Sequence, residues 1–365
     1  MDNDTNYAIP SQDIAPKMAS LGLHSSNKLQ PFHCIGSGNC GSVWSIENPG
    51  INTSVIKRED MNEARSVYND FIMHRKILSA IQELRLSPET VSLTSRVSMP
   101  ACHQYVRADE STWWSTRLGR FPKECQAPCN VIVTERIPPF SQTARECLIN
   151  RFCAPGGRET AKTSASNRDC IVRAYLGRRK LNDRPKRFFK LPNFPMNIDQ
   201  MKQLDLDVEH YATAMAEMLA IMHWKAQMDA NDVEFVLAPP RLTHEVSTQA
   251  SPSSTIKSIH LGDHNLWILD FDCCGDMTMD TNGVDQAWRA FYKNDPYYPR
   301  PSTANRVKSV EDQQLWDIFK ARFLEASEII LGPESNIGHL PGLLISKIES
   351  GNPHIIQKLN AGTTD

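Results

Sequence analysis

Two distant groups of residues in this chain have the types and spacing that chemistry needs. The first group contains Gly36, Gly38 and Gly41 in a G-x-G-x-x-G-x-V pattern and ends at Lys57. Glycine lets a backbone lie close over a phosphate group, and a lysine supplies a point charge for phosphate oxygens. The second group lies far along the chain and is rich in aspartate and glutamate. We expect the two groups to form the halves of one site.

The acidic half consists of a loop and a strand end. Carboxylates closely spaced in a loop are suited to general base catalysis or to binding hard metal ions. His223 precedes the loop, and a pair of aspartates follows a later apolar run. We therefore predict catalytic roles for Asp229, Asp232 and Glu234. Substrate or nucleotide binding is predicted for the three glycines and for Lys57, His223, Asp270 and Asp272.

The residues after the glycines discriminate between two folds that share this motif. A dinucleotide-binding fold requires a helix at that point. Here Ser42–Ile46 has the composition of a strand, residues 47–50 read as a turn, and a second strand-like run ends at Lys57. A glycine loop, a hairpin and then a lysine is the arrangement of protein kinases. In that fold the strand end with Asp270 lies beside the carboxylate loop, and its first aspartate holds the metal.

This sequence departs from the kinase pattern at several positions. The asparagine expected five residues after the catalytic aspartate is replaced by Glu234, and the metal-binding D-F-G is replaced by D-F-D at 270–272. The helix after the lysine has His74 near the usual glutamate position, with Asp70 one turn earlier. A phosphotransferase acting on small molecules and a non-catalytic kinase-like module that binds a nucleotide or a partner protein both remain open alternatives.

The surrounding elements follow from hydrophobic periodicity and turn residues. Apolar residues at i, i+3, i+4 and i+7 predict a helix over 206–224. Residues 154–168, rich in Gly, Ser and Thr, read as a surface loop. Further helices are expected at 63–78, 283–292 and 309–329, and strands at 129–137, 234–238 and 266–272.

These elements predict an α+β, two-lobed, protein-kinase-like fold with a small β-rich N-lobe and a larger helical C-lobe. We expect a disordered tail at 1–28, followed by an N-lobe at 29–140 that carries the glycine-rich loop. The C-lobe, 141–365, carries the carboxylate loop, and a Ser/Thr-rich stretch at 241–258 reads as a flexible insertion.

Composition limits the classes of function and of site. The chain has 365 residues, with 40 Lys and Arg against 42 Asp and Glu, so no overall charge attracts nucleic acid or membrane. The N-terminus lacks a signal-peptide pattern and no stretch could span a bilayer, so we expect a cytoplasmic protein without a membrane partner. The ten cysteines show no paired zinc-ligand framework. No metal site is predicted, and Cys40 is the thiol best placed to react.

One local stretch favours an RNA partner. Between residues 168 and 190, nine Arg and Lys residues face two Asp residues, with Tyr175, Phe188 and Phe189 interleaved. Basic charge beside aromatic faces is typical of single-stranded nucleic-acid binding. A solvated basic loop, or one that binds nucleotide phosphates, is the competing interpretation. The predicted RNA-binding residues are Arg173, Arg178, Arg179, Lys186 and Arg187.

Several stretches resemble a fungal protein family usually labelled as zinc-finger proteins of unknown function. The resemblance covers roughly residues 30–330 and therefore nearly the whole expected fold. It is carried by VIKRED (55–60), VTERIPPF (133–140), RAYLGRR (173–179), FPMNIDQM (194–201), AMAEMLAIMHWKAQMDANDVEFVL (214–237), WILDFDCC (267–274) and FYKNDPYYPRP (291–301).

That family is identified as including the arginine-containing cyclodipeptide synthases of secondary-metabolite biosynthesis. The resemblance implies an enzyme that condenses arginine with a second amino acid into a diketopiperazine. It implies arginyl-tRNA and a second aminoacyl-tRNA or amino acid as partners, downstream biosynthetic enzymes, and no required cofactor. The phosphotransferase alternative would instead use ATP with Mg²⁺. Paired carboxylates, such as those of the acidic loop, are natural partners for a guanidinium group.

Overall fold

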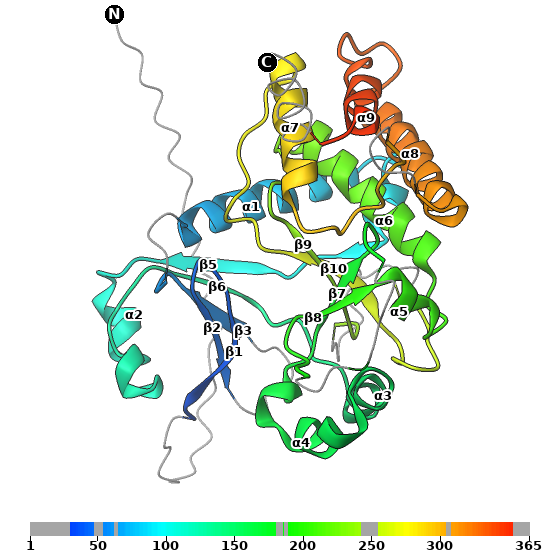
Figure 1. The fold of residues 1–365 in the computed structure, drawn as a ribbon. Helices are drawn as coiled ribbons and strands as arrows, with labels where there is room; N and C mark the ends of the chain where they lie inside the picture. Colours follow the sequence, from blue (N-terminus) through cyan, green and yellow to red (C-terminus); the bar gives the residue numbers. More distant parts are fainter. Residues whose placement is uncertain are drawn as a thin grey trace, which may run out of the picture.

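The computed structural model describes residues 30–46, 54–61, 65–179, 185, 189–241, 255–303 and 308–352. In these residues the chain forms a mixed α+β structure with two five-stranded sheets (Figure 1). The predicted tail, residues 1–28, and most of the predicted insertion, residues 242–254, lie outside the described residues.

The first sheet is antiparallel, with the strand order β1-β2-β3-β6-β5. Val43 of β2 pairs with Lys57 of β3, so a strand and not a helix follows the glycines, as predicted. Alternate residues of β6 face opposite sides: Val131 packs with Trp44, whereas Ile132 packs with Cys40. The strands are β1 Phe32–Ser37, β2 Ser42–Ile46, β3 Ser54–Arg58, β5 Cys102–Val106 and β6 Val131–Glu135.

The second sheet is mixed, with the strand order β4-β10-β9-β7-β8. Its central pair, β9 and β10, is antiparallel, and the register places Glu234 opposite Leu269. Since Asp270 directly follows Leu269, this register brings the two predicted acidic segments together. The strands are β4 Val97–Ser98, β7 Val172–Tyr175, β8 Phe194–Asn197, β9 Glu234–Ala238 and β10 Asn265–Leu269.

Helix α1 packs against β5 and β6 of the first sheet, whereas α6 packs against α8 and lies beside the second sheet (Figure 1). The predicted 206–224 helix is confirmed as α6, followed by a π-helical turn at Ile221–Lys225. Asp207 caps α6 by accepting from the backbone N–H of His210 at 3.0 Å. Buried aromatic residues of α8 pack in the same core. The helices are α1 Val67–Leu84, α2 Ser111–Ser115, α3 Gln142–Phe152, α4 Arg158–Thr163, α5 Ile198–Lys202, α6 Val208–Ala220, α7 Thr281–Lys293, α8 Val310–Leu331 and α9 Leu340–Ser350.

Two expected elements differ from the structure. Helix α1 starts after Ser66, whose side chain accepts from the N–H of Tyr68, and continues beyond the predicted end at residue 78. Buried Ile77, Ile81 and Leu84 continue the helical spacing, which explains the extra turns. The predicted loop at 154–168 contains the short helix α4. In the described part of the chain, no helix is long and apolar enough to cross a membrane.

Candidate functional site

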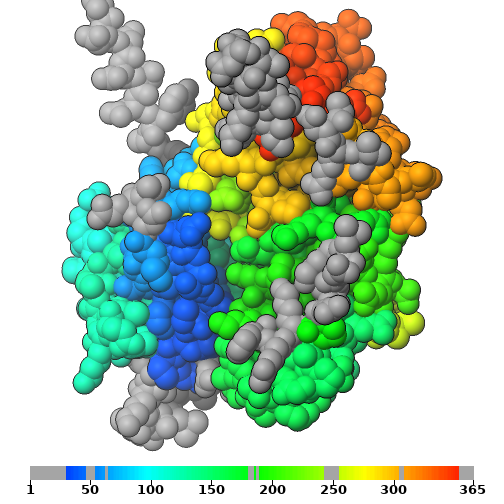
Figure 2. Space-filling model, viewed as in Figure 1, coloured from blue at the N-terminus to red at the C-terminus, as the bar shows by residue number. Residues whose placement is uncertain are grey.

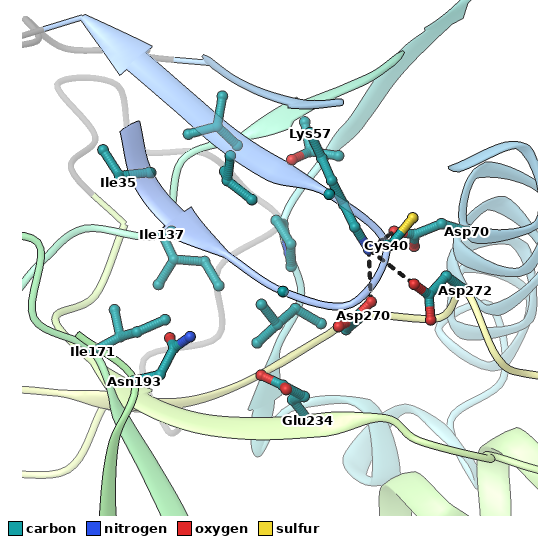
Figure 3. Close-up of a pocket in the computed structure, with 18 of the residues that line it drawn as sticks. Ile35, Cys40, Lys57, Asp70, Ile137, Ile171, Asn193, Glu234, Asp270 and Asp272 are labelled. Atoms are coloured by element: carbon teal, nitrogen blue, oxygen red, sulfur yellow. Dashed lines mark hydrogen bonds and ion pairs between the residues drawn. The ribbon is translucent and has the colours of Figure 1, made fainter. Parts of the chain in front are cut away.

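A cavity of about 610 Å³ lies where the glycine turn of the first sheet meets β9 and β10 of the second. Ile35, Ile137 and Ile171 line its apolar end (Figure 3). Lys57 and several carboxylates line the other end. From outside, residues of the first sheet (blue) lie along a seam beside residues near 150–200 (green) in Figure 2. The cavity therefore collects side chains from both predicted halves of the site.

The glycine turn forms one wall of the cavity. Gly38 donates its backbone N–H to the carbonyl of Gly41 at 2.9 Å, which closes the turn. A Cβ atom on Gly41 would lie 1.7 Å from the carbonyl oxygen of Arg58, so only glycine fits there. Gly36 and Gly38 have room for a side chain and also line the cavity. Burial raises the pKa of Cys40 to about 12, which keeps this thiol protonated.

Lys57 lies at the centre of a carboxylate cluster. Its Nζ atom is 2.6 Å from Asp70 Oδ2, 2.6 Å from Asp270 Oδ1 and 3.7 Å from Asp272 Oδ2. Burial lowers the pKa of Lys57, but the three carboxylates, Asp270 foremost, outweigh burial and raise it well above its usual value. Lys57 is therefore a permanent cation whose charge is already balanced by protein groups.

Asp70 is a site residue that the sequence patterns did not assign. It comes from α1, binds Lys57, and accepts from the backbone N–H of Phe271 at 3.2 Å. His74, which occupies the usual glutamate position, instead contacts the carbonyl of Pro100 at 2.8 Å. The sequence did contain a sign that Asp70 faces the site. It lies four residues before His74, which is near the usual glutamate position, and residues four apart lie on one helix face.

Asp229, which was predicted to be catalytic, instead uses its carboxylate for hydrogen bonds that hold the acidic loop in place. Its Oδ1 accepts from the backbone N–H groups of Asn231 and Gly275 at 3.0 and 2.9 Å. Its Oδ2 accepts from Gln286 of α7 at 2.8 Å. The side chain is buried and is not part of the cavity lining, which includes Asp232 and Glu234. These contacts give Asp229 a positioning role for the neighbouring carboxylates.

Glu234 begins β9, faces the cavity and forms an ion pair with Arg173 of β7. Burial raises the pKa of Glu234 to about 7; Arg173 opposes this rise, and Asp270 adds to it. Because its pKa lies near neutral pH, the carboxylate is suited to accept a proton from a substrate. Arg173 also lies 3.7 Å from Asp295, which accepts from Tyr175 at 2.7 Å.

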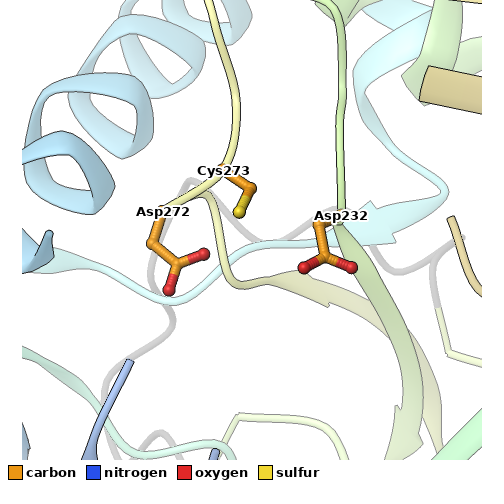
Figure 4. A group of neighbouring side chains, drawn as sticks. All are labelled: Asp232, Asp272 and Cys273. Carbon is orange, nitrogen blue, oxygen red and sulfur yellow. The ribbon is translucent and has the colours of Figure 1, made fainter. Parts of the chain in front are cut away.

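Asp232 and Asp272 face each other near Cys273 (Figure 4). Among the described residues, these three are the group of acidic, Cys or His side chains whose ligand atoms could share a metal ion. Arg65 binds both carboxylates, at 3.0 Å from Asp232 and 2.8 Å from Asp272. A protein cation therefore already pairs with these two side chains.

Asp232 and Asp270 have left-handed backbones, with φ of 63° and 67°. Backbone strain of this kind clusters at functional sites.

The charge of the lining is acidic. Among the lining residues that the structure describes, eight carboxylates face five Lys and Arg side chains. An excess of carboxylates attracts a cationic ligand and opposes an unshielded polyphosphate. The carboxylates are Asp70, Glu135, Asp169, Asp232, Glu234, Asp270, Asp272 and Asp295, and the cations are Lys57, Arg65, Arg136, Arg173 and Lys293.

His223, which we predicted to bind substrate or nucleotide, lies in the core. It sits in the π-helical turn, is 1% exposed, and packs against the rings of Trp224 and Phe323. Burial lowers the pKa of His223 to about 3, so the ring stays neutral. His223 is not part of the cavity lining, so its role is in the packing of the core.

The predicted RNA-binding residues have different environments. Arg173 pairs with Glu234 inside the cavity, and Arg179 pairs with three acidic side chains of α5 and α8. Arg178 is exposed and remains available to a partner. Lys186 and Arg187 lie outside the described residues. Two of the five predicted RNA-binding residues, Arg173 and Arg179, thus form ion pairs with carboxylates of the protein itself.

These contacts predict that Arg178 and Arg179 respond differently to substitution. Arg179 lies 2.7 Å from both Asp199 and Asp312, so Arg179→Ala should lower the free energy of unfolding by about 1–2 kcal/mol. Arg178→Ala should change it by less than about 0.5 kcal/mol, because its side chain is exposed. Chemical denaturation of both variants measures the two effects. Equal unfolding free energies for the two variants would contradict the role given to Arg179.

One family profile matches part of the chain. The family, described as zinc finger protein (DUF3669), matches residues 266–335. The matched stretch runs from β10 through α8 and carries Asp270 and Asp272, while the glycine turn and the loop with Glu234 lie outside it. A search of curated proteins found no match to this chain.

Proposed function

We propose that this protein is an aminoacyl-tRNA-dependent cyclodipeptide synthase that condenses arginine with a second amino acid into a diketopiperazine. One observation carries the proposal. Glu234 is a carboxyl with a pKa near 7, and it lies in a cavity whose lining has more carboxylates than cations. Such a cavity favours a cationic substrate and contains a base that works at neutral pH. An ester of arginine is a substrate of this kind.

The first step joins the two amino acids. Glu234 accepts a proton from the α-amino group of the second amino acid, which then attacks the ester carbonyl of arginyl-tRNA. A C–N bond forms, the ester C–O bond breaks, and the ribose hydroxyl leaves with a proton that Glu234 returns. The ester is already activated, so the barrier is lowered mainly by orienting the two groups and by proton transfer.

The second step closes the ring. The α-amino group of the arginyl residue attacks the carbonyl of the second amino acid, and a second amide forms. This closure needs a second activated carbonyl, which a second tRNA ester supplies. The same base removes the proton from the attacking amine and delivers it to the second ribose hydroxyl. Both steps thus use one carboxyl in alternating protonation states.

A two-lobed, protein-kinase-like architecture is part of the proposal. It is supported by the glycine turn and by Lys57 on the third strand, paired with Asp70 of α1 and with Asp270 after β10. The apolar end of the cavity, with Ile35, Ile137 and Ile171, offers a slot for a planar ring. We expect this slot to accept the terminal adenosine of tRNA.

The same features also favour a second candidate, a small-molecule phosphotransferase. Asp270 and Glu234 are the carboxylates that would hold Mg²⁺ with ATP, and Lys57 is the cation that would approach phosphate. We rank this candidate second because Lys57 has three carboxylates within 4 Å and little free charge to offer a phosphate. Glu234 also replaces the neutral asparagine of the kinase pattern.

One assay separates the candidates. The purified protein is incubated with arginine, the other amino acids, tRNA, aminoacyl-tRNA synthetases and ATP, and the products are analysed by mass spectrometry. We expect an arginine-containing diketopiperazine that disappears after ribonuclease treatment. A product that persists after ribonuclease would contradict dependence on tRNA. Transfer of the ATP γ-phosphate to a small molecule in a parallel reaction without tRNA would favour the phosphotransferase.

A further inference from the structure

Arg65 makes a contact that the proposed chemistry does not use. It lies just before α1 and inserts its guanidinium group between the two acidic segments of the site. Nη1 and Nη2 each lie 3.0 Å from Asp232 Oδ2, and Nη1 lies 2.8 Å from Asp272 Oδ1. The contact thus shows how these two carboxylates hold a guanidinium group inside the cavity.

The two carboxylates are positioned by groups other than Arg65. The backbone N–H of Asp232 donates to Asn294 Oδ1 at 2.5 Å, and the carbonyl of Asp272 accepts from Asn69 Nδ2 at 2.9 Å. The Asp272 side chain is 2% exposed, and Lys57 lies 3.7 Å from its other oxygen. These contacts hold the backbone at both aspartates independently of Arg65, and Lys57 also holds the Asp272 carboxylate, whereas the Asp232 side chain is 45% exposed and has room to turn towards a new cation.

We infer that Asp232 and Asp272 form a guanidinium subsite, which Arg65 fills in the ligand-free protein and from which an arginine substrate displaces it. The inference rests on the proposed function and names the part of the cavity that selects arginine. The side chain of Arg65 and that of the substrate present the same planar group, so they compete for the same two carboxylates.

One competing ligand and one competing site are less favourable. A divalent cation carries twice the charge of a guanidinium group, so Lys57, 3.7 Å from Asp272, repels it more strongly. Glu234 is the other carboxyl that a guanidinium group could approach, but Arg173 already pairs with it. Burial also raises its pKa to about 7, so its negative charge is incomplete at neutral pH. Asp232 and Asp272 thus remain the better partners for a guanidinium substrate.

Competition by Arg65 has a measurable consequence. The apparent affinity for a ligand is reduced by the fraction of protein in which its subsite is free. If Arg65 fills the subsite about 90% of the time or more, its removal tightens the binding of L-arginine by about tenfold or more. L-Citrulline, the neutral analogue of L-arginine, should gain little, because its ureido group can donate hydrogen bonds but cannot form an ion pair with the two carboxylates.

Calorimetry with L-arginine as the probe tests the inference. Arg65→Ala should bind L-arginine about tenfold more tightly than the wild-type protein, with little gain for L-citrulline. Arg96→Ala is the matched control, since Arg96 pairs with Glu217, which is not part of the cavity lining. It should leave the affinity unchanged. Adding Asp232→Asn to Arg65→Ala should abolish the gain, because the subsite then lacks one carboxylate.

Folding and turnover are checked separately. Arg65→Gln, which keeps a hydrogen-bond donor towards the carboxylates, provides a second background, and thermal melting shows which variant is folded. Unchanged or weaker L-arginine binding in a folded Arg65 variant overturns the inference. So does a gain that survives Asp232→Asn. Because binding of the free amino acid needs no tRNA and no turnover, the subsite can fail while diketopiperazine synthesis succeeds, or the reverse.

Discussion

Glu234→Gln should lower kcat for diketopiperazine formation by about 100-fold to 10,000-fold, the usual contribution of a general base. Glutamine keeps the size of the side chain and a contact with Arg173, but it cannot accept a proton. In the wild-type protein, kcat/KM should rise as the pH increases through about 7, because Glu234 is active only when deprotonated. The variant should lose this rise while keeping its fold.

Burial raises the pKa of Glu234 most, and the charged groups that act on it are Arg173 from β7, Asp270 after β10 and Lys57 from β3. The α-amino group of the substrate titrates separately, with a pKa of about 7.7–8.0, and this part of the profile should persist in the variant. Glu328→Gln, which changes an exposed glutamate of α8, is the control and should retain wild-type rates. A Glu234→Gln variant with a wild-type rate and pH profile would remove Glu234 from the mechanism.

Lys57→Met should lower the free energy of unfolding by about 3–5 kcal/mol, because it leaves Asp70, Asp270 and Asp272 without their shared cation. The three carboxylates line the cavity, so their repulsion should disturb its shape and activity should fall below detection. Methionine preserves the length of the side chain, which separates the loss of charge from the loss of packing. Chemical denaturation at several pH values measures the effect.

The pH dependence of that variant has a defined sign. Burial raises the pKa of Asp270 above its unfolded value, and Lys57 opposes the rise. Without Lys57 the folded-state pKa rises further, so folding favours the protonated form. The stability that protonation provides is present at low pH and is lost as the pH rises through the folded-state pKa. The deficit should therefore be smaller at pH 5 than at pH 8.

A matched lysine provides the control for Lys57. Lys76, also a lysine paired with an aspartate, lies 2.5 Å from Asp276, whose side chain is 78% exposed. Exposed ion pairs contribute about 0–1 kcal/mol, so Lys76→Met should have little effect on the free energy of unfolding. If Lys57→Met cost no more than Lys76→Met, the carboxylate cluster would not depend on Lys57.

Local patterns predicted the elements that carry the site. The β-rich composition after the glycines correctly excluded a helix, and the apolar run at 234–238 is β9 with the same ends. Helix α6 followed from its i, i+3, i+4 spacing, because a helix packed on a core needs one apolar face. These predictions succeeded because periodicity and turn residues act within a few positions along the chain.

The partners of the charged side chains were not predictable in the same way. The sequence gives no sign that Arg173 meets Glu234, or that Arg65 meets Asp232 and Asp272. Each pair is separated by many residues and depends on how two sheets and α1 pack together. The basic stretch around Arg179 looked like an RNA surface because charge alone does not reveal an internal acidic partner.

The sequence by itself determined that the chain contains a glycine turn followed by a hairpin, a lysine, and two acidic segments at strand ends. Local backbone preferences and hydrophobic spacing suffice for that. Only the tertiary structure decided which carboxylates line the cavity and which instead accept hydrogen bonds from loop backbone groups. It also decided which carboxyl has a pKa near 7. Those properties depend on burial and on the distance to charges from other elements, and the register of β9 and β10 and the packing of α1 fix both.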